Sequence, residues 1–140
     1  MEATLMTRLA AIFPVVLALL LGACAYKHEA IYNVDRAMLP GTERLSQDRI
    51  RDVIVSAGKQ LEWNMTPIAP GHLEATQNAP KYAATVDIYY APTRLQILIK
   101  STTNLLQTST TIHAHYNFWI RNLESQITTD LQLAAGGKSG

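Results

Sequence analysis

The clearest structural signal in the chain is the stretch YAATVDIYYAPTRLQILIK, residues 82–100. From Tyr82 to Tyr90, apolar residues alternate with more polar ones, and a period of two returns from Leu95 to Ile99. The intervening Ala-Pro-Thr, residues 91–93, is typical of a turn. Because so short a turn joins the two runs, the pattern predicts a pair of adjacent antiparallel strands.

A second hairpin is predicted just upstream. Trp63 and Met65 alternate with polar neighbours, Pro70 and Gly71 favour a turn, and residues 72–76 return. Together the two hairpins predict an antiparallel meander of three to four strands.

Two helices are predicted, one before the meander in the sequence and one after it. Ser46 can cap the first helix, and a longer helix is expected from Ile112. The apolar stripe of the first is Ile50, Val53, Ile54, Ala57 and Leu61, and that of the second is Ile112, Tyr116, Trp119, Ile120, Leu123, Ile127 and Leu131. Because each helix has one apolar face, we expect an α+β domain over residues 45–135, with both helices packed on one face of the sheet. Residues 136–140 are expected to be a flexible tail.

Composition limits the function classes. The 140 residues are 48% hydrophobic and 16% charged, with a net charge of +1. This balance excludes an acidic disordered chain and gives no basic patch for nucleic acid. The length allows one domain.

The first 23 residues have the three parts of a secretory signal peptide. Arg8 is basic, residues 9–21 are 13 uncharged, mainly apolar residues, and Gly22-Ala23 supplies small side chains before a cut. Glu2 is unusual in such a signal, so Met6 is the start that we expect. A single-pass membrane anchor is an alternative for this segment, but Pro14 and its marginal length favour a signal peptide.

The residues Leu21-Gly22-Ala23-Cys24 resemble the lipobox of bacterial lipoproteins. The resemblance implies that the Cys24 thiol takes a diacylglycerol group, that the peptide is cut before it, and that the new amine is acylated. Such acyl chains anchor a protein stably in a membrane. Ala25 in place of aspartate resembles outer-membrane lipoproteins, which implies the periplasmic face of the outer membrane. A lone buried cysteine is the alternative interpretation of Cys24.

Residues 24–44 are expected to form the lipidated N-terminus and a tether. Periodic apolar residues are few there, and Pro40-Gly41 favours irregular structure. Within the tether, residues 31–34 are expected to be briefly extended.

Several side chains are candidates for chemistry. His113 and His115 could hold zinc on a strand, but on the expected helix they point apart, so capping or a surface position is the favoured interpretation. Asn117 lies one turn after His113 and could bind it or a ligand. An aromatic group could line an apolar ligand pocket, but core packing is the favoured interpretation, above all for Tyr116 and Trp119; the group is Trp63, Tyr82, Tyr89, Tyr90, Tyr116, Phe118 and Trp119. Phe118 and Tyr89 point away from the apolar stripes and are expected to mark a contact surface.

Most of the mature chain also resembles a family of small, uncharacterised Gram-negative bacterial lipoproteins. The residues that carry the resemblance are the lipobox, 31–34, the helix from Leu45, Trp63, 70–75, 84–90, 101–105 and 112–123. The most specific part is Ile-His-x-x-Tyr-Asn-x-Trp-Ile at 112–120 with Asn104-Leu105 upstream, which implies that Asn104 packs against the start of the last helix. Glu62, where the family tends to have glycine, is a departure. The resemblance implies no particular activity.

These observations predict a non-catalytic, lipid-anchored periplasmic module that binds an envelope protein, a glycan or a small apolar ligand. Asn104, His113 and Asn117 are its candidate polar cluster, either structural or ligand-binding, and no metal or cofactor is expected. The alternative is a small enzyme acting on envelope material. Glu74, Asp87 and Glu124 look isolated in the sequence, so no acid–base pair is predicted.

Overall fold

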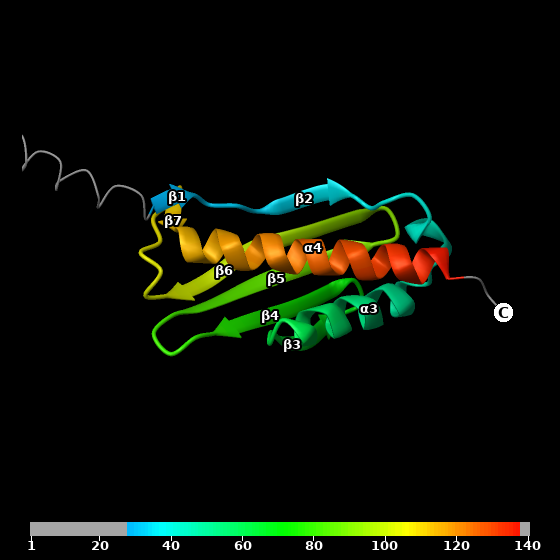
Figure 1. Cartoon of the computed structure of the whole chain (residues 1–140), viewed down its shortest axis with the longest axis horizontal. Helices are drawn as coiled ribbons and strands as arrows, with labels where there is room; N and C mark the ends of the chain where they lie inside the picture. The colour runs from blue at the N-terminus through cyan, green and yellow to red at the C-terminus, as the bar shows by residue number, and fades with distance from the viewer. Residues whose placement is uncertain (1–27, 138–140) are drawn as a thin grey trace, which may run out of the picture.

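The computed structural model describes residues 28–137 and has the predicted α+β fold (Figure 1). In chain order the elements are β1 His28–Ala30, β2 Val34–Ala37, the 3-10 turn η2 Thr42–Arg44, α3 Gln47–Gln60, β3 Asn64–Ala69, β4 His72–Asn78, β5 Ala83–Ala91, β6 Arg94–Thr103, β7 Thr111–His113 and α4 Ala114–Gly136. Both helices lie on one face of the main sheet and pack against each other, as predicted (Figure 1).

The main sheet has five strands in the order β2-β6-β5-β4-β3, and every neighbouring pair is antiparallel. The predicted meander is therefore confirmed as β3 to β6, and β2 is added beside β6. β1 and β7 form a separate two-stranded sheet.

Alternation along β5 fixes which face of the sheet is the core. Ala84, Val86 and Ile88 are buried, whereas Thr85 and Asp87 between them remain partly exposed. The buried residues pack with the predicted stripes of α3 and α4 into one hydrophobic core. Burial of these apolar side chains is the main stabilising contribution to the fold.

The two helices begin differently. At α3 the Ser46 hydroxyl accepts a hydrogen bond from the Arg49 N–H at 3.1 Å, as expected of a cap. At α4 the expected start at Ile112 is wrong, because residues 111–113 form β7 and pair with β1. Ile112 is buried in a strand, and its helical spacing from Tyr116 is coincidental.

Residues 28–44 are part of the fold, so the expectation of a tether there is wrong. β2 pairs with β6, and Val34 is only 2% exposed. Residues 28–37, here called the N-terminal strap, also bind α4: the Tyr32 hydroxyl donates to Glu124 at 2.7 Å, and Arg36 donates to the same carboxylate at 3.0 Å. The sequence of the strap does not predict a strand because it is too polar, and the strap's partners, β6 and α4, lie far along the chain.

Candidate functional site

The predicted lipid-attachment residue, Cys24, lies outside the described residues, as do the signal peptide and the last residues of the expected tail. The described chain begins at His28 in β1. Within residues 28–137, no helix is both long and apolar enough to span a bilayer.

Asn117 is buried on α4 and holds the N-terminal strap. Its Oδ1 accepts from the Tyr32 N–H at 2.9 Å, and its Nδ2 donates to the Ala30 carbonyl at 2.8 Å and to the Glu29 carboxylate at 2.9 Å. The side chain is 1% exposed. The Asn117 amide therefore has a structural role, and it makes no hydrogen bond to His113.

Asn104 directly follows β6, and His113 ends β7 and precedes α4. Asn104 has a positive φ of 55° and donates to the Lys81 carbonyl at 3.0 Å. His113 donates its backbone N–H to Leu105 at 2.9 Å, and its Nδ1 accepts from the His115 N–H at 3.1 Å, which caps α4. The helix start is thus bonded to Leu105 rather than to Asn104, and Asn104 and Asn117 bind different backbone segments.

The histidine pair has aromatic partners. The Tyr82 ring lies 6.2 Å from that of His113 and 5.8 Å from that of His115. Among the described residues, no group of three or more His, Cys, Asp or Glu side chains is placed to hold a metal ion.

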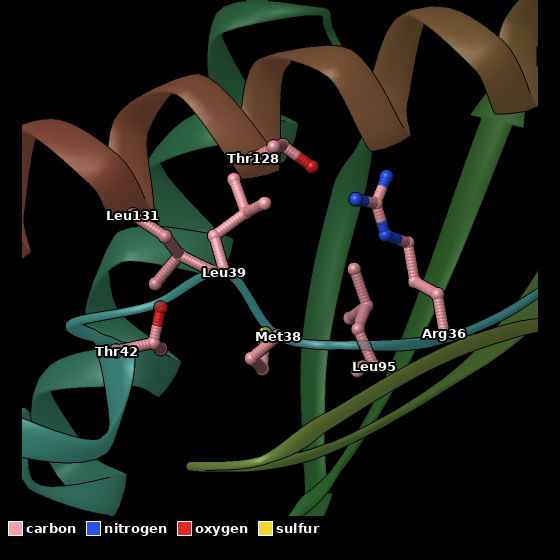
Figure 2. A pocket seen from close by; sticks show the side chains of 8 residues that line it. Arg36, Met38, Leu39, Thr42, Leu95, Thr128 and Leu131 are labelled. Carbon is pink, nitrogen blue, oxygen red and sulfur yellow. The ribbon is translucent and has the colours of Figure 1, made fainter.

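The cavity drawn in Figure 2 is too small for an organic ligand. It has a volume of about 10 Å³ and lies between the segment 36–42 and α4, which contributes Thr128 and Leu131. Such a volume accommodates about one water molecule, whereas ligand pockets have about 300–1,000 Å³. Larger hollows are open grooves on the surface, such as one of 390 Å³ between α3 and α4.

The sheet face opposite the helices carries a group of interacting polar side chains, which we call the sheet-face cluster. Its members are His72, Glu74, Asp87, Tyr89 and Lys100. His72 Nε2 lies 2.8 Å from Asp87 Oδ1. Lys100 Nζ donates to Glu74 at 2.6 Å and lies 3.8 Å from Asp87. The rings of His72 and Tyr89 stack with their centroids 4.4 Å apart.

Strand register builds this cluster. His72 is opposite Tyr89, and Glu74 is opposite Asp87, across β4 and β5. The β5–β6 register shifts between Thr85 and Val86, where Val86 faces Ile99 and Thr85 faces Ser101. Lys100 is the extra residue of this bulge, which aims its side chain at the face of the cluster.

The charges of the sheet face are paired. The hydrogen bond to Glu74, together with the nearby Asp87 carboxylate, raises the pKa of Lys100. At the edge of the same face, Arg94 makes two hydrogen bonds to Asp35, at 2.8 and 2.7 Å, and these lower the pKa of the Asp35 carboxyl. The face therefore offers fixed donors and acceptors, with each carboxylate beside a basic side chain.

The expectation that Glu74 and Asp87 are isolated is wrong, and the cluster is not evident from the sequence pattern. The available signal was the hairpin itself: counting back from the turn between β4 and β5 places the two residues opposite each other. The position of Lys100 depends on the bulge, which the period-two pattern does not show.

Comparison with known proteins adds no family to this picture. No protein-family model matches the chain, and no curated protein is significantly similar to it in sequence.

Proposed function

We propose that this chain is a lipid-anchored lipoprotein on the periplasmic face of a bacterial outer membrane, and that it binds an envelope glycan without catalysis. The glycan lies on the open sheet face, over the sheet-face cluster. The signal-like residues 1–23 and the lipobox cysteine Cys24 support the anchor.

The observation that carries the binding role is the fixed polar arrangement on an uncovered sheet face. Because each charge has a partner, a neutral ligand can approach without stripping water from an isolated ion. Glycan hydroxyl and amide groups are both donors and acceptors, which suits a surface where carboxylates and ammonium or imidazole groups lie side by side.

Tyr89 supplies an apolar plate next to these polar groups. Its side chain is 39% exposed, and stacking on His72 holds its ring in place. A flat ring beside fixed polar groups is a pre-organised surface for a sugar. The C–H face of the sugar is apolar and can stack on the ring, while the hydroxyl groups at its edge bind the polar groups. The cavity of Figure 2 does not admit a small apolar ligand, because it has only about 10 Å³.

Lipid attachment is tested by the intact mass of the membrane-extracted protein. We expect a triacylated chain beginning at Cys24, with the Cys24→Ser variant left as an unprocessed precursor. Unmodified mass, or normal processing of the serine variant, contradicts the anchor. Sucrose-gradient fractionation tests which membrane holds the protein. Co-migration with inner-membrane markers contradicts the proposed outer-membrane location.

Glycan binding is tested by calorimetric titration of the purified protein with soluble fragments of the bacterial cell-wall glycan. We expect Tyr89→Ala to weaken binding about tenfold or more, which corresponds to 1.4 kcal/mol or more. Leu133→Ala is the matched control, because Leu133 is also exposed but lies on α4, on the other side of the sheet. Absence of binding, or equal affinity of the Tyr89 variant, contradicts the proposal, as does capture of an envelope protein by this face instead.

The second candidate is a small enzyme acting on envelope glycan, and the His72–Asp87 contact favours it. A carboxylate that orients an imidazole is an arrangement used for general-base catalysis. Its test is the mass of the glycan fragments after incubation with the protein. Cleavage that is lost in His72→Gln establishes the enzyme, whereas unchanged fragments that still bind establish the binding module.

A further inference from the structure

The end of the fold at which the chain enters carries aromatic, apolar and basic residues that are exposed or half-buried. In Figure 1, β1, β7, the start of α4 and the turn between β4 and β5 all lie at this end, and the C-terminus of α4 lies at the other. We call this surface the entry patch; its members are His28, Lys81, Tyr82, Leu106, His113, His115 and Phe118.

Several contacts join members of the entry patch. His28 is opposite His113 in the β1–β7 pair. The rings of Phe118 and His115 are 6.3 Å apart, and Tyr82 reaches both His113 and His115. Leu106 follows Leu105, whose carbonyl accepts the His113 N–H. The patch is therefore one surface built from four segments of the chain.

Two of its residues expose large apolar side chains. Phe118 is 58% exposed and Leu106 is 59% exposed. Aromatic and apolar side chains of this kind are favoured at the boundary between water and lipid.

The charge of the entry patch also suits a phospholipid surface. Lys81 is exposed and basic, and the histidines add positive charge when protonated. The nearest carboxylate, Glu29, is occupied by Asn117 at 2.9 Å and lies 3.8 Å from Arg121. Basic groups at a membrane surface are attracted to anionic headgroups.

The covalent distance from the expected lipid restricts which surface can meet the membrane. Residues 25–27 separate Cys24 from His28. Even a fully extended chain covers at most about 3.6 Å per residue. The Cα atoms of Cys24 and His28 are therefore no more than about 14 Å apart. Since the acyl chains fix Cys24 at the membrane boundary, His28 is held close to the headgroups.

We propose that the entry patch lies against the phospholipid headgroups, with Phe118 and Leu106 dipping into the interface. The domain then stands on this end, and the C-terminal end of α4 points away from the bilayer. This orientation rests on the proposed anchor at Cys24 and extends it, because it assigns a second, non-covalent contact between the domain and the membrane.

The experiment uses the lipidated full-length protein in vesicles of zwitterionic and anionic phospholipids that carry a lipid-attached quencher. Cys24 is the chain's single cysteine, and its thiol is blocked by the lipid. A cysteine introduced by Phe118→Cys or Leu106→Cys is then the one site that an environment-sensitive fluorophore labels. Leu133→Cys is the control, because Leu133 is 70% exposed on the same helix as Phe118 but near its far end.

We expect blue-shifted emission and several-fold stronger lipid quenching at positions 118 and 106 than at position 133. Equal quenching at all three positions in lipidated protein overturns the orientation and leaves the anchor intact. A blue shift at 118 without lipid quenching assigns the patch to a second copy of the chain and also overturns the orientation. If the intact mass shows that Cys24 carries no lipid, the anchor itself fails and the orientation fails with it.

Discussion

Asn117 on α4 accepts a hydrogen bond from the backbone N–H of Tyr32 at 2.9 Å, across 85 positions of sequence. The same side-chain amide donates to the Ala30 carbonyl at 2.8 Å. One buried side chain thus satisfies two backbone groups of the N-terminal strap, between β1 and β2. Together with the Glu124 contacts and the pairing of β2 with β6, this residue holds the strap on the domain.

Replacing Asn117 by alanine should lower the free energy of unfolding by about 1–3 kcal/mol, because the part-buried Tyr32 N–H and Ala30 carbonyl lose their bonds to its amide. Asn117→Asp should cost at least as much at neutral pH, since the new carboxylate faces the Ala30 carbonyl and Glu29. Urea denaturation measures both. Asn122→Ala, exposed on the same helix, is the control and should change little.

The Tyr32 hydroxyl should stabilise the fold only while it is protonated. Its hydrogen bond to the Glu124 carboxylate raises the pKa of Tyr32 above its ordinary value of 10.0. A raised pKa means that the contribution is complete below pH 10.0 and is lost as the pH rises through the folded-state value.

Tyr32→Phe tests this dependence because it keeps the ring, over which the Arg121 guanidinium lies at 4.8 Å. We expect the variant to be less stable by about 1–2 kcal/mol at neutral pH. This is below the usual value of about 1.5–3 kcal/mol for a hydrogen bond to a charged group, because Tyr32 is only part-buried and solvent screens the bond. The difference between wild type and variant should vanish at strongly alkaline pH. A difference that persists there would show that the hydroxyl acts through packing rather than through its proton.

Gly58 on α3 has no room for a side chain. A Cβ at this position would lie 2.3 Å from the Met65 Sδ and 2.9 Å from its Cγ. Although alanine favours helix by about 1 kcal/mol, the overpacking costs about 1–3 kcal/mol. We therefore expect Gly58→Ala to destabilise the protein.

A double-mutant cycle separates these two effects. In a Met65→Ala background the obstacle is removed, so Gly58→Ala should become stabilising by about 1 kcal/mol. If the alanine destabilises both backgrounds equally, the contact with Met65 is not the cause.

Glu62 lies between α3 and β3 in a left-handed conformation, with φ of 64°. This conformation costs a residue with a Cβ about 1–2 kcal/mol, while glycine adds about 0.4–1 kcal/mol of entropy to the unfolded chain. Glu62→Gly should therefore stabilise the protein by up to about 1 kcal/mol in denaturant titrations. Glu62→Ala keeps the Cβ and should give no such gain.

Removing the N-terminal strap should make the domain aggregate. A chain that begins at Leu45 lacks β2, so β6 becomes an open sheet edge and the buried Val34 contact is lost. Size-exclusion chromatography should show oligomers of this shortened chain, whereas a chain beginning at His28 should elute as a monomer. A monomeric, cooperatively unfolding shortened chain would show that β2 is dispensable.

The elements that the sequence predicted are those whose information is local. The alternation of Val86 and Ile88 with Thr85 and Asp87 predicts a strand with one buried face, and the structure has it. Ser46 and the apolar stripe of α3 were also sufficient to predict that helix, because a cap and a helical period are set by residues a few positions apart.

The elements that the sequence did not show depend on distant partners. β2 contains Asp35 and Arg36, whose polarity suggests a tether until Arg94 and Glu124 are seen to pair with them. The sheet-face cluster is similar, since His72 and Asp87 meet through register. The bulge that places Lys100 beside them leaves no trace in the hydrophobic pattern.

The strap has a mechanical consequence for a protein held at its N-terminus. A pull on the chain before His28 reaches α4 through the amide of Asn117 and then through Glu124, which binds Tyr32 and Arg36. The load is thus divided between points about two turns apart on the longest helix of the fold. A force on the domain would therefore act on the bonds between the strap and α4 before it could separate β2 from β6.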